Sequence, residues 1–241
     1  MSAHDASGIL YVRASLKPFA RQIKAAGSLP QFLKEEFAHS ELLVPYFTGA
    51  RPFWQAPRDS GSTNSGALGR LVAAQEGAVA STHATHRFAG TGGRVGAALA
   101  AHLPQSACFQ PIADLAAGSD FSMLLLGCVE ESPGFSTVHA VQEELGLTRR
   151  HLIRHVLRWD IPGRGAIVAP EAPGCSRSFG KFYPAYAADG NLVDGVLAGQ
   201  RYLLVPSARR AMAVERAILS ANPRFVECGR WNCETCRLRS Y

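Results

Sequence analysis

A chain of 241 residues can bury a sizeable core, either as one large domain or as a domain with a small appendage. Its 47% hydrophobic and 18% charged residues are globular values, and no apolar run is long enough to form a membrane-spanning helix. The formal net charge is +6. Residues 1–8 lack the basic and apolar regions of a secretory signal, so we expect a cytoplasmic protein whose six unevenly spaced cysteines form no disulfide framework.

The positive charge is concentrated in two stretches. Residues 149–164 hold five arginines and two histidines against one acid, and residues 201–241 hold eight arginines against three glutamates. Such stretches are usually solvated faces, but they also suit a phosphate-bearing partner such as coenzyme A, a nucleotide or RNA, because the guanidinium fork matches phosphate oxygens. No RNA-binding or DNA-reading motif accompanies the arginines, so the sequence disfavours a nucleic-acid partner.

The chain opens with a pattern typical of an α/β sheet. Ile9–Val12 is a short apolar run that predicts a strand, and Arg13–Leu16 follows at its carboxyl end, where open α/β sheets bind ligands. Ser28–Phe37 predicts a helix, because a serine can cap it and a proline suits its first turn. Leu42–Tyr46 predicts a second strand. Thr48–Ser65 is rich in Gly, Pro, Ser and Asn and is interpreted as a long surface loop, a kind of segment that is often functional.

The next part of the chain alternates turns with short helices. Gly61–Leu68 opens a helix that runs toward Ala74. Small polar residues ahead of a helix N-terminus offer backbone donors to an anion or a carbonyl, although most such stretches are only caps. Ser81–Ala89 contains two histidines, His83 among them, and Val95–His102 predicts a further helix.

The segment from residue 121 to residue 146 is the most informative. Met123–Leu126 is a short apolar run closed by a glycine, as in a strand buried on both faces. A turn with proline and glycine follows, and the Ser-Thr pair at 136–137 can cap a helix. On that helix His139 lies one turn before Gln142 and Glu143, so an imidazole and a carboxylate can share a face. The pattern suits a rigidly held general base, and a histidine that only fills space in a capped helix is the alternative.

The C-terminal half contains predicted strands and one long helix. Leu152–Trp159 alternates apolar and basic residues like a half-exposed strand, and Gly163–Gly180 is interpreted as a loop. Asn191–Gly199 and Arg201–Val205 predict a strand pair. Ser207–Ser220 predicts a helix that is capped by its first serine and has one apolar face.

The last residues carry a cysteine pattern that fits a metal ion. Cys228, Cys233 and Cys236 include one CxxC pair but lack a fourth ligand nearby, which Cys175 or a histidine can supply after folding. We predict a structural zinc site that attaches a possible C-terminal appendage, residues 222–241, to the core. A plain CxxC in a reducing compartment is the alternative.

Six short segments, in order over nearly the whole chain, share the pattern of one enzyme family. They are Val12–Leu16, Leu43–Phe47, Ser65–Leu68, Ser81–Ala89, Leu124–Gly127 and Ser136–His139. In these segments the chain resembles the antibiotic N-acetyltransferase family, typified by the aminoglycoside 3-N-acetyltransferases. The first segment reads Val-Arg-Ala-Ser-Leu where the family commonly has Val-His-Ser-Ser-Leu.

The resemblance implies a single three-layer α/β/α domain over residues 1–241, distinct from the common GNAT fold of N-acetyltransferases. It implies transfer of an acetyl group from acetyl-CoA to an amine such as an aminoglycoside, without an acyl-enzyme. His139 is then the general base that takes the proton from the amine, a task that suits an imidazole. The residues that would lie along the coenzyme A channel are Arg13, Ser15, Leu16, Ser65, Gly66, Ala67 and Leu68.

Departures from the family pattern bear on the mechanism. The family usually places Glu three residues after the histidine, where this chain has Gln142. Gln142 can orient the ring without supplying charge, and Glu143 can reach the ring from the next position. The family's His-Pro pair is His83-Ala84 here, and His83 is the rival base because it lies in another matching segment.

The charge of the chain bears on the acceptor. Aminoglycosides are polycations, and an isoelectric point near 9.2 is the opposite of what their attraction requires, although Glu130, Glu131, Glu143 and Glu144 can supply an acidic cleft. A less cationic amine therefore competes as acceptor, and an acidic acyl-carrier protein or a tRNA competes as donor. The alternative from another class is a binding protein of the same fold without catalysis.

Overall fold

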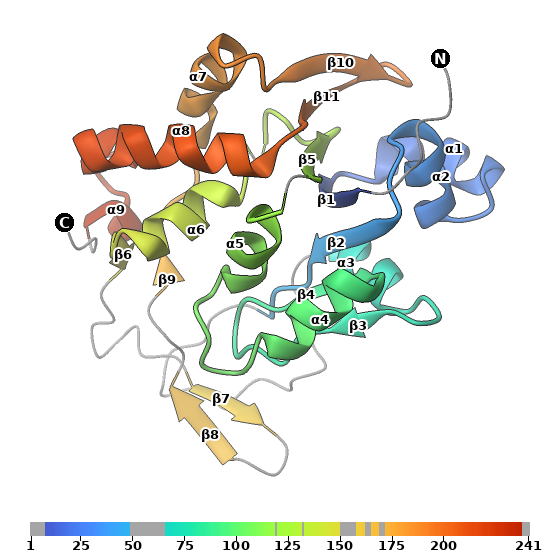
Figure 1. Cartoon of the computed structure of the whole chain (residues 1–241), viewed down its shortest axis with the longest axis horizontal. Helices are drawn as coiled ribbons and strands as arrows, with labels where there is room; N and C mark the ends of the chain where they lie inside the picture. Colours follow the sequence, from blue (N-terminus) through green and yellow to red (C-terminus); the bar gives the residue numbers. More distant parts are fainter. Residues whose placement is uncertain are drawn as a thin grey trace.

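A mixed sheet built from the short apolar runs of the chain lies at the centre of the molecule. In the computed structural model, which describes residues 8–48, 66–118, 120–131, 133–149, 158–161, 165–168 and 172–237, seven strands follow the order β10-β11-β5-β1-β2-β4-β3 (Figure 1). They are β1 (Ile9–Ala14), β2 (Glu41–Pro45), β3 (Val79–Ala80), β4 (Phe88–Thr91), β5 (Phe121–Leu126), β10 (Val193–Leu197) and β11 (Gln200–Val205).

The three central strands β2, β1 and β5 run parallel and end at one edge of the sheet. β1 pairs with β5 from Ile9 opposite Phe121 to Ala14 opposite Leu126. Every residue of β5 except Ser122 is buried, because helices cover both faces of this strand. The loops that follow β1, β2 and β5 therefore meet at one edge, which we call the carboxyl edge.

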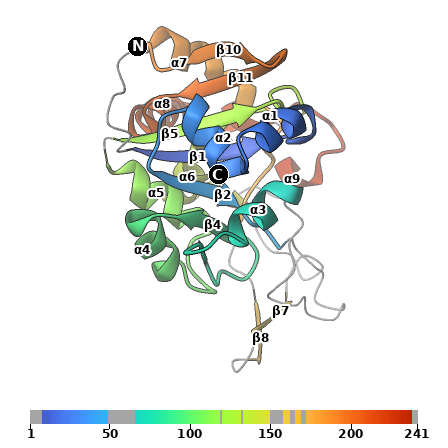
Figure 2. The same cartoon turned by 90° about the vertical axis from the view of Figure 1, so that its right-hand side faces the viewer.

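Helices cover the two faces of the sheet in separate layers, as Figures 1 and 2 show. One layer packs with Leu10 and Val12, and the other packs with Ile9 and Tyr11, because successive side chains of β1 point to opposite faces. The predicted three-layer α/β/α fold is therefore confirmed. The first layer contains α1 (Ala20–Ala25), α2 (Leu29–Glu36) and α3 (Gly66–Ala73), and the second contains α4 (Gly93–Ala101), α5 (Gln110–Ala116), α6 (Thr137–Glu144), α7 (Tyr183–Ala188) and α8 (Ala208–Ala221).

Short elements complete the C-terminal half. A 3₁₀ turn, η3, follows the small strand β9, and the C-terminal residues from η4 onward return to pack against it. These elements are β6 (Thr148–Arg149) paired with β9 (Ala172–Pro173), β7 (Arg158–Ile161) paired with β8 (Gly165–Val168), η3 (Phe179–Phe182), η4 (Pro223–Val226) and α9 (Glu234–Arg237).

Most of the predicted elements are present, including two serine caps. The hydroxyl of Ser28 accepts the Gln31 N–H at 3.2 Å, and that of Ser207 accepts the Arg210 N–H at 3.3 Å. The confirmed predictions are the strands at Ile9–Val12, Leu42–Tyr46, Met123–Leu126, Asn191–Gly199 and Arg201–Val205 and the helices at Ser28–Phe37, Gly61–Ala74 in its described part, Val95–His102 and Ser207–Ser220.

Two predictions of local structure are wrong. Gly163–Gly180, expected to be a loop, contains β8 and β9 and the start of η3, because these short strands form through pairing with other segments rather than through local periodicity. α6 begins where the Ser-Thr pair predicted it, but neither hydroxyl caps the helix. Ser136 is hydrogen-bonded to Tyr11 instead, and Thr137 donates to Glu215.

The strand β4 and the helix α5 were not predicted. β4 has only four residues, and two of them are Ala and Gly, which carry little strand signal. α5 has seven residues with a proline in its first turn and is too short for a clear helical period. Residues 49–65 of the predicted long loop and residues 152–157 of the strand predicted at Leu152–Trp159 lie outside the described residues.

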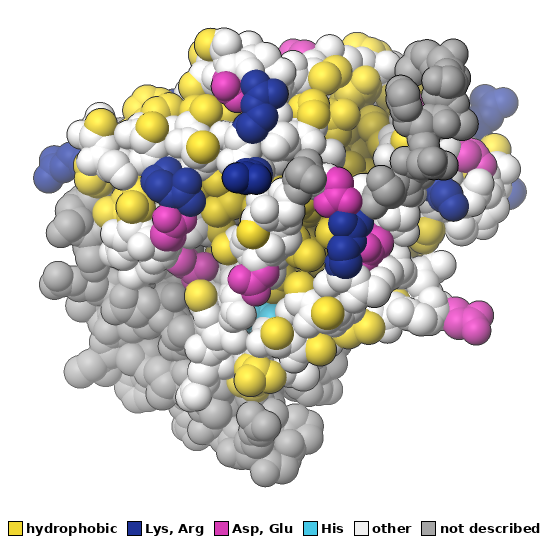
Figure 3. Space-filling model, viewed as in Figure 1, with side chains coloured by type: hydrophobic (Ala, Val, Ile, Leu, Met, Phe, Trp, Pro, Cys, Tyr) yellow, Lys and Arg dark blue, Asp and Glu magenta, His cyan; other side chains and the backbone are white. Residues whose placement is uncertain are grey.

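The surface over α8 mixes charges of both signs, as the adjoining blue and magenta side chains in Figure 3 show. In the described part of the basic 201–241 stretch, Arg201, Arg210 and Arg216 form ion pairs, so this stretch presents less net positive charge than its sequence implies. The ion pairs are Arg201 with Glu130 and Asp194, Arg210 with Asp189, and Arg216 with Glu144.

Among the described helices, none has both the length and the apolar character needed to cross a membrane.

Candidate active site

The loop between β5 and α6 places His139 at the carboxyl edge. This loop is tied to β1 at two points. The guanidinium of Arg13 donates to the carbonyl of Gly134 at 2.8 Å, and the hydroxyls of Tyr11 and Ser136 are hydrogen-bonded at 2.8 Å. α6 therefore starts beside the end of β1, with His139 in its first turn.

The imidazole of His139 is oriented by three neighbours. Its Nδ1 donates to Oε1 of Gln142 at 3.0 Å, which is the tautomer that carries the lone pair on Nε2. Phe109 stacks on the ring at a centroid distance of 4.6 Å and an angle of 29°, and Phe179 meets it at 4.6 Å and 64°. The residue is half-buried, so the histidine is held rigidly without being sealed in the core.

Glu143 does not share the face that the sequence suggested. Its carboxylate accepts the backbone N–H groups of Cys108, at 2.6 Å, and Phe109, at 2.8 Å. Burial raises the pKa of this carboxyl to about 7, although these two hydrogen bonds work in the opposite direction. Of the two candidate ring partners, Gln142 contacts the imidazole, and Glu143 instead holds the segment that carries Phe109.

Gln142 occupies the position where the resembled family usually has Glu. It is fully buried, and among the described residues its Nε2 has no hydrogen-bond partner. A buried donor without a partner costs about 1–3 kcal/mol. A carboxylate here would leave no such donor and would stabilise an imidazolium. The glutamine therefore orients the ring but supplies no charge.

Behind α6, a buried carboxyl joins three helices. Glu215 on α8 accepts hydrogen bonds from Thr137, at 2.6 Å, and from the hydroxyl of Tyr186 on α7. Burial raises the pKa of Glu215 to about 7, against the effect of both hydrogen bonds. This cluster fixes the first residue of α6, and with it the start of the helix that presents His139.

His83 lies in a different environment. It is fully buried, its Nε2 donates to the carbonyl of Ser106 at 2.9 Å, and its Nδ1 accepts the N–H groups of Thr85 and His86. Burial lowers its pKa to about 4. Its ring also stacks on His102 at 4.5 Å. Both ring nitrogens are thus bonded to the backbone, which is the arrangement of a structural histidine.

The residues predicted along a coenzyme A channel lie on two sides of the carboxyl edge. Arg13 faces the His139 side, while Leu16 and Leu68 belong to the apolar cluster on the opposite face. The N–H of Ser15 donates to the carbonyl of Leu126 at 3.0 Å and so joins the ends of β1 and β5. Gly66 and Ala67 open α3, and Ser65 lies outside the described residues.

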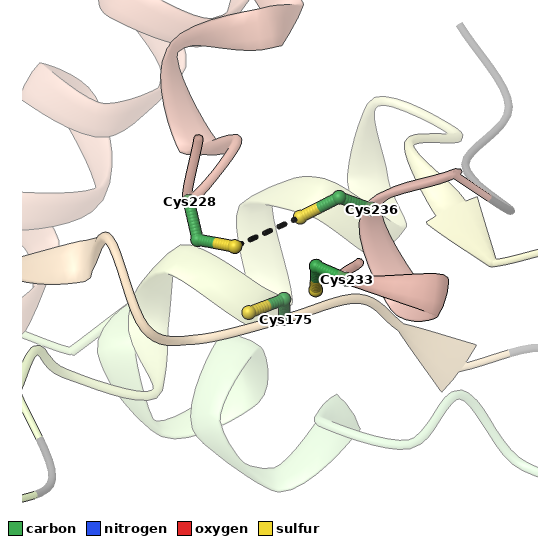
Figure 4. Close-up of side chains that lie close together, drawn as sticks. All are labelled: Cys175, Cys228, Cys233 and Cys236. Carbon is green, nitrogen blue, oxygen red and sulfur yellow. Dashed lines mark hydrogen bonds between the residues drawn. The ribbon is translucent and has the colours of Figure 1, made fainter. Parts of the chain in front are cut away.

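The four cysteines predicted as metal ligands come together, as Figure 4 shows. The sulfur atoms of Cys175, Cys228, Cys233 and Cys236 all lie within 4.8 Å of one another, and the Cys236 and Cys228 sulfurs are 3.7 Å apart. Tetrahedral zinc with Zn–S bonds of about 2.3 Å needs sulfur–sulfur separations of roughly 3.8 Å. Burial opposes ionisation of Cys233, yet the N–H of Cys236 and the neighbouring thiols lower its pKa to about 7. The cluster fits a closed Cys₄ zinc site.

Comparison with known proteins defines the class of fold. No protein-family model and no curated protein sequence matches the chain. The apoenzyme of aminoglycoside acetyltransferase AAC(3)-IVa matches with a TM-score of 0.75 at 17% identity, over 96% of this chain and 89% of that one. AAC-IIIb in binary complex with CoASH matches with a TM-score of 0.70 at 15% identity, over 89% and 90%.

A third solved structure, a histidine-to-alanine variant of AAC(3)-IVa in complex with a gentamicin, matches with a TM-score of 0.74 at 17% identity, over 95% and 90% of the two chains. These matches cover nearly the whole of each protein. The chain is an α/β/α protein with a histidine at the carboxyl edge of its sheet. Its fold is that of the aminoglycoside 3-N-acetyltransferases, as the resemblance in sequence predicted.

Proposed function

We propose that the protein is a coenzyme A-dependent N-acyltransferase in which His139 is the general base. The observation that carries the proposal is the hydrogen bond from Nδ1 of His139 to Gln142 at the carboxyl edge, which assigns the lone pair to Nε2. Solved neighbours of this fold bind CoASH and gentamicin, which supports a thioester donor and an amine acceptor.

In the proposed reaction the amine nitrogen attacks the thioester carbonyl of acetyl-CoA. As the C–N bond forms, the amine proton passes to Nε2 of His139. The tetrahedral adduct then collapses, the C–S bond breaks, and the imidazolium returns the proton to the departing thiolate. The products are an amide and CoA-SH. A positioned base of this kind contributes roughly 10²- to 10⁴-fold to the rate.

The proposed coenzyme A channel runs along the carboxyl edge. Arg13, Ser15 and Leu16 follow or end β1, and Gly66, Ala67 and Leu68 open α3 after β2. α3 packs against the end of β2, where a Cβ on Gly69 would meet the carbonyl of Pro45, so both groups lie near the ends of adjacent parallel strands, where open α/β sheets bind ligands. Ser65 completes the proposed set.

The acceptor class is proposed from the charge of the protein. A basic protein attracts a polycation poorly, so we expect slower turnover of gentamicin-like amines than of a less cationic amine such as a monoamino sugar. Measurement of kcat/KM for both acceptors decides this, and efficient turnover of gentamicin would reverse the assignment. An acidic acyl-carrier protein is a second candidate donor, because its negative charge complements the positive charge of this protein.

A thiol-release assay with acetyl-CoA and a panel of amines tests the function itself. An enzyme releases CoA-SH in an amine-dependent manner and yields the acetylated amine by mass spectrometry. A non-catalytic binding protein of the same fold binds coenzyme A in calorimetry but releases no thiol with any amine.

We also propose that the four-cysteine cluster holds a structural zinc ion. A closed set of four thiolates leaves no open position for substrate, so the metal would attach the C-terminal residues to the core rather than take part in the chemistry. Elemental analysis of untagged protein should give about one zinc per chain by tetrahedral stoichiometry, and Cys233→Ser should release it and lower the melting temperature. Metal-free protein of undiminished stability would contradict this proposal.

A further inference from the structure

The two aromatic rings around His139 come from segments that are distant in sequence. Phe109 stands at the start of α5, and Phe179 opens η3. Each ring centroid is 4.6 Å from that of the imidazole. Together with the Gln142 hydrogen bond, they limit the rotation of His139, so their own positions matter for where Nε2 points.

The two rings are held in place from different directions. Phe109 is secured from α6 itself, because Glu143 accepts its N–H. Phe179 is 1% exposed and packs against Gly134, where an added Cβ would collide with the Cβ of Phe179. Gly134 has a φ of +88°, which also favours glycine. The backbone of the β5–α6 loop thus touches Phe179 directly.

The C-terminal residues hold the segment that carries Phe179. The hydroxyl of Ser178 donates to the carbonyl of Val226 at 2.5 Å. The ammonium group of Lys181 donates to the carbonyls of Phe225, at 3.2 Å, and Glu227, at 2.9 Å. These bonds flank Phe179 on both sides in sequence and connect it to residues 225–227.

The cysteine cluster joins the same two segments, the one that carries Phe179 and the C-terminal residues. Cys175 lies four residues before Phe179, and the other three cysteines lie on the C-terminal residues that follow Glu227. A metal bound by the four sulfurs would therefore fix both ends of one unit: the chain leading into η3 and the residues that bind η3. Residues of the proposed coenzyme A channel lie outside this unit, but the unit contacts the imidazole of His139 through Phe179.

We infer that this metal-clamped unit positions the catalytic base, with Phe179 as the positioning residue through which it acts. The inference rests on the proposed role of His139. Without the metal, the 175–182 segment loses one of its anchors, Phe179 shifts, and His139 samples rotations in which Nε2 no longer faces the amine. Turnover then falls more than coenzyme A affinity does, because Phe179 contacts the imidazole of His139 directly but reaches the channel residue Arg13 through Gly134.

The first test replaces Phe179 with Leu, which keeps an apolar side chain but removes the flat ring. The matched control is Phe121→Leu, a similarly buried phenylalanine at the first residue of β5, the end of the strand away from the carboxyl edge. A misplaced catalytic group typically costs up to about 100-fold in rate. We expect Phe179→Leu to lower kcat by roughly 10- to 100-fold with KM for acetyl-CoA within a few-fold of the wild type, and Phe121→Leu to lower the melting temperature without that loss of kcat. Equal kcat values for Phe179→Leu and the wild type would overturn the inference.

The second test measures the His139 ring directly and needs no activity. Its imidazole ¹H–¹⁵N signals are assigned by their absence from His139→Asn. Removal of zinc by a chelator under native conditions should shift them, and added zinc should restore them. Unchanged signals on zinc removal, or protein that binds no zinc, would overturn the inference even if the enzyme acetylates amines. Shifted signals in a protein that releases no thiol would instead retain the positioning unit and refute the proposed reaction.

Discussion

Two histidines of this chain, His83 and His139, lie in opposite environments. His83 is fully buried, and both of its ring nitrogens are bonded to backbone groups. His139 is half-buried, and its Nδ1 is bonded to a side chain on its own helix. The first arrangement stabilises a turn, and the second orients a ring at the carboxyl edge. Burial and the kind of partner, rather than the sequence motif, separate the structural histidine from the candidate base.

The buried carboxyl groups divide in a similar way. Glu215 is fully buried, and its hydrogen bonds join α6, α7 and α8. His83 is also fully buried, and its hydrogen bonds join its own turn to the carbonyl of Ser106. Glu143 lies between the two cases, because it contacts backbone but acts on a neighbour of the imidazole. Replacements are therefore expected to fall into two groups: changes in stability at His83 and Glu215, and changes in turnover at His139 and Glu143.

The largest effect is expected at His139. His139→Ala should lower kcat by roughly two to four orders of magnitude, because the amine then loses its proton acceptor. His139→Asn retains hydrogen bonding without accepting a proton and should be nearly as slow. The affinity for acetyl-CoA, measured by calorimetry, should stay within a few-fold of the wild type. A fully active His139→Ala protein would remove the distinction between the two histidines.

His83→Ala should act on stability. It leaves a cavity and strips one carbonyl and two N–H groups of their partner, which together cost at least about 3 kcal/mol. Urea unfolding should show this loss, and the kcat of the folded fraction should remain within a few-fold of the wild type. A loss of kcat as large as that of His139→Ala, at unchanged stability, would make His83 the base.

Glu215→Gln should change the pH dependence of stability. The pKa of Glu215 is raised to about 7 in the folded protein, from about 4.5 in the unfolded chain. Its contribution to the free energy of unfolding is therefore complete below about pH 4.5 and is lost as the pH rises from about 4.5 to 7. At about 1.4 kcal/mol per pKa unit, the wild type should lose roughly 3 kcal/mol relative to the variant over this window.

The pKa of His83 is lowered to about 4, so this residue makes the folded protein more stable as the pH rises from about 4 to 6.5. Its effect on the pH dependence of stability is opposite to that of Glu215. The informative quantity is therefore the difference between the variant and the wild type at each pH, from urea unfolding at about pH 5, 6, 7 and 8. A difference that does not change with pH would show that Glu215 titrates normally.

The smallest effect is expected for Glu143→Gln. The amide keeps one acceptor oxygen for the Cys108 and Phe109 N–H groups but turns a donor toward the other, so Phe109 loosens without leaving. We expect kcat to fall by about tenfold or less, well below the loss at His139. A loss of kcat equal to that of His139→Ala would indicate that Glu143 takes part directly in the proton transfer.

Local patterns in the sequence predicted the parts of the molecule that are set locally. The Met123–Leu126 strand and the helix presenting His139 follow from an apolar run and a turn. The same patterns placed Cys228, Cys233 and Cys236 in one cluster, but they could not choose between Cys175 and a histidine as the fourth member. That choice depends on the return of the C-terminal residues to the segment after β9, which no local spacing records.

The aromatic neighbours of His139 were missed for the same reason. Phe109 immediately precedes α5 and Phe179 opens η3, both short elements with no clear period, and what brings these rings to His139 is packing between distant segments. Glu143 was assigned to the ring from its spacing on the helix, but the start of α5 offers it two N–H groups, and this distant partner decides its orientation.

A crystal structure of the protein with coenzyme A tests the proposed reaction most directly. We expect the pantetheine chain to pass along Arg13–Leu16 and the start of α3. Its thiol should end beside Nε2 of His139, close enough for an amine between them to be within about 3.2 Å of that nitrogen. Coenzyme A bound elsewhere, for example over the arginines of α8, or with its thiol directed away from His139, would contradict the proposed reaction.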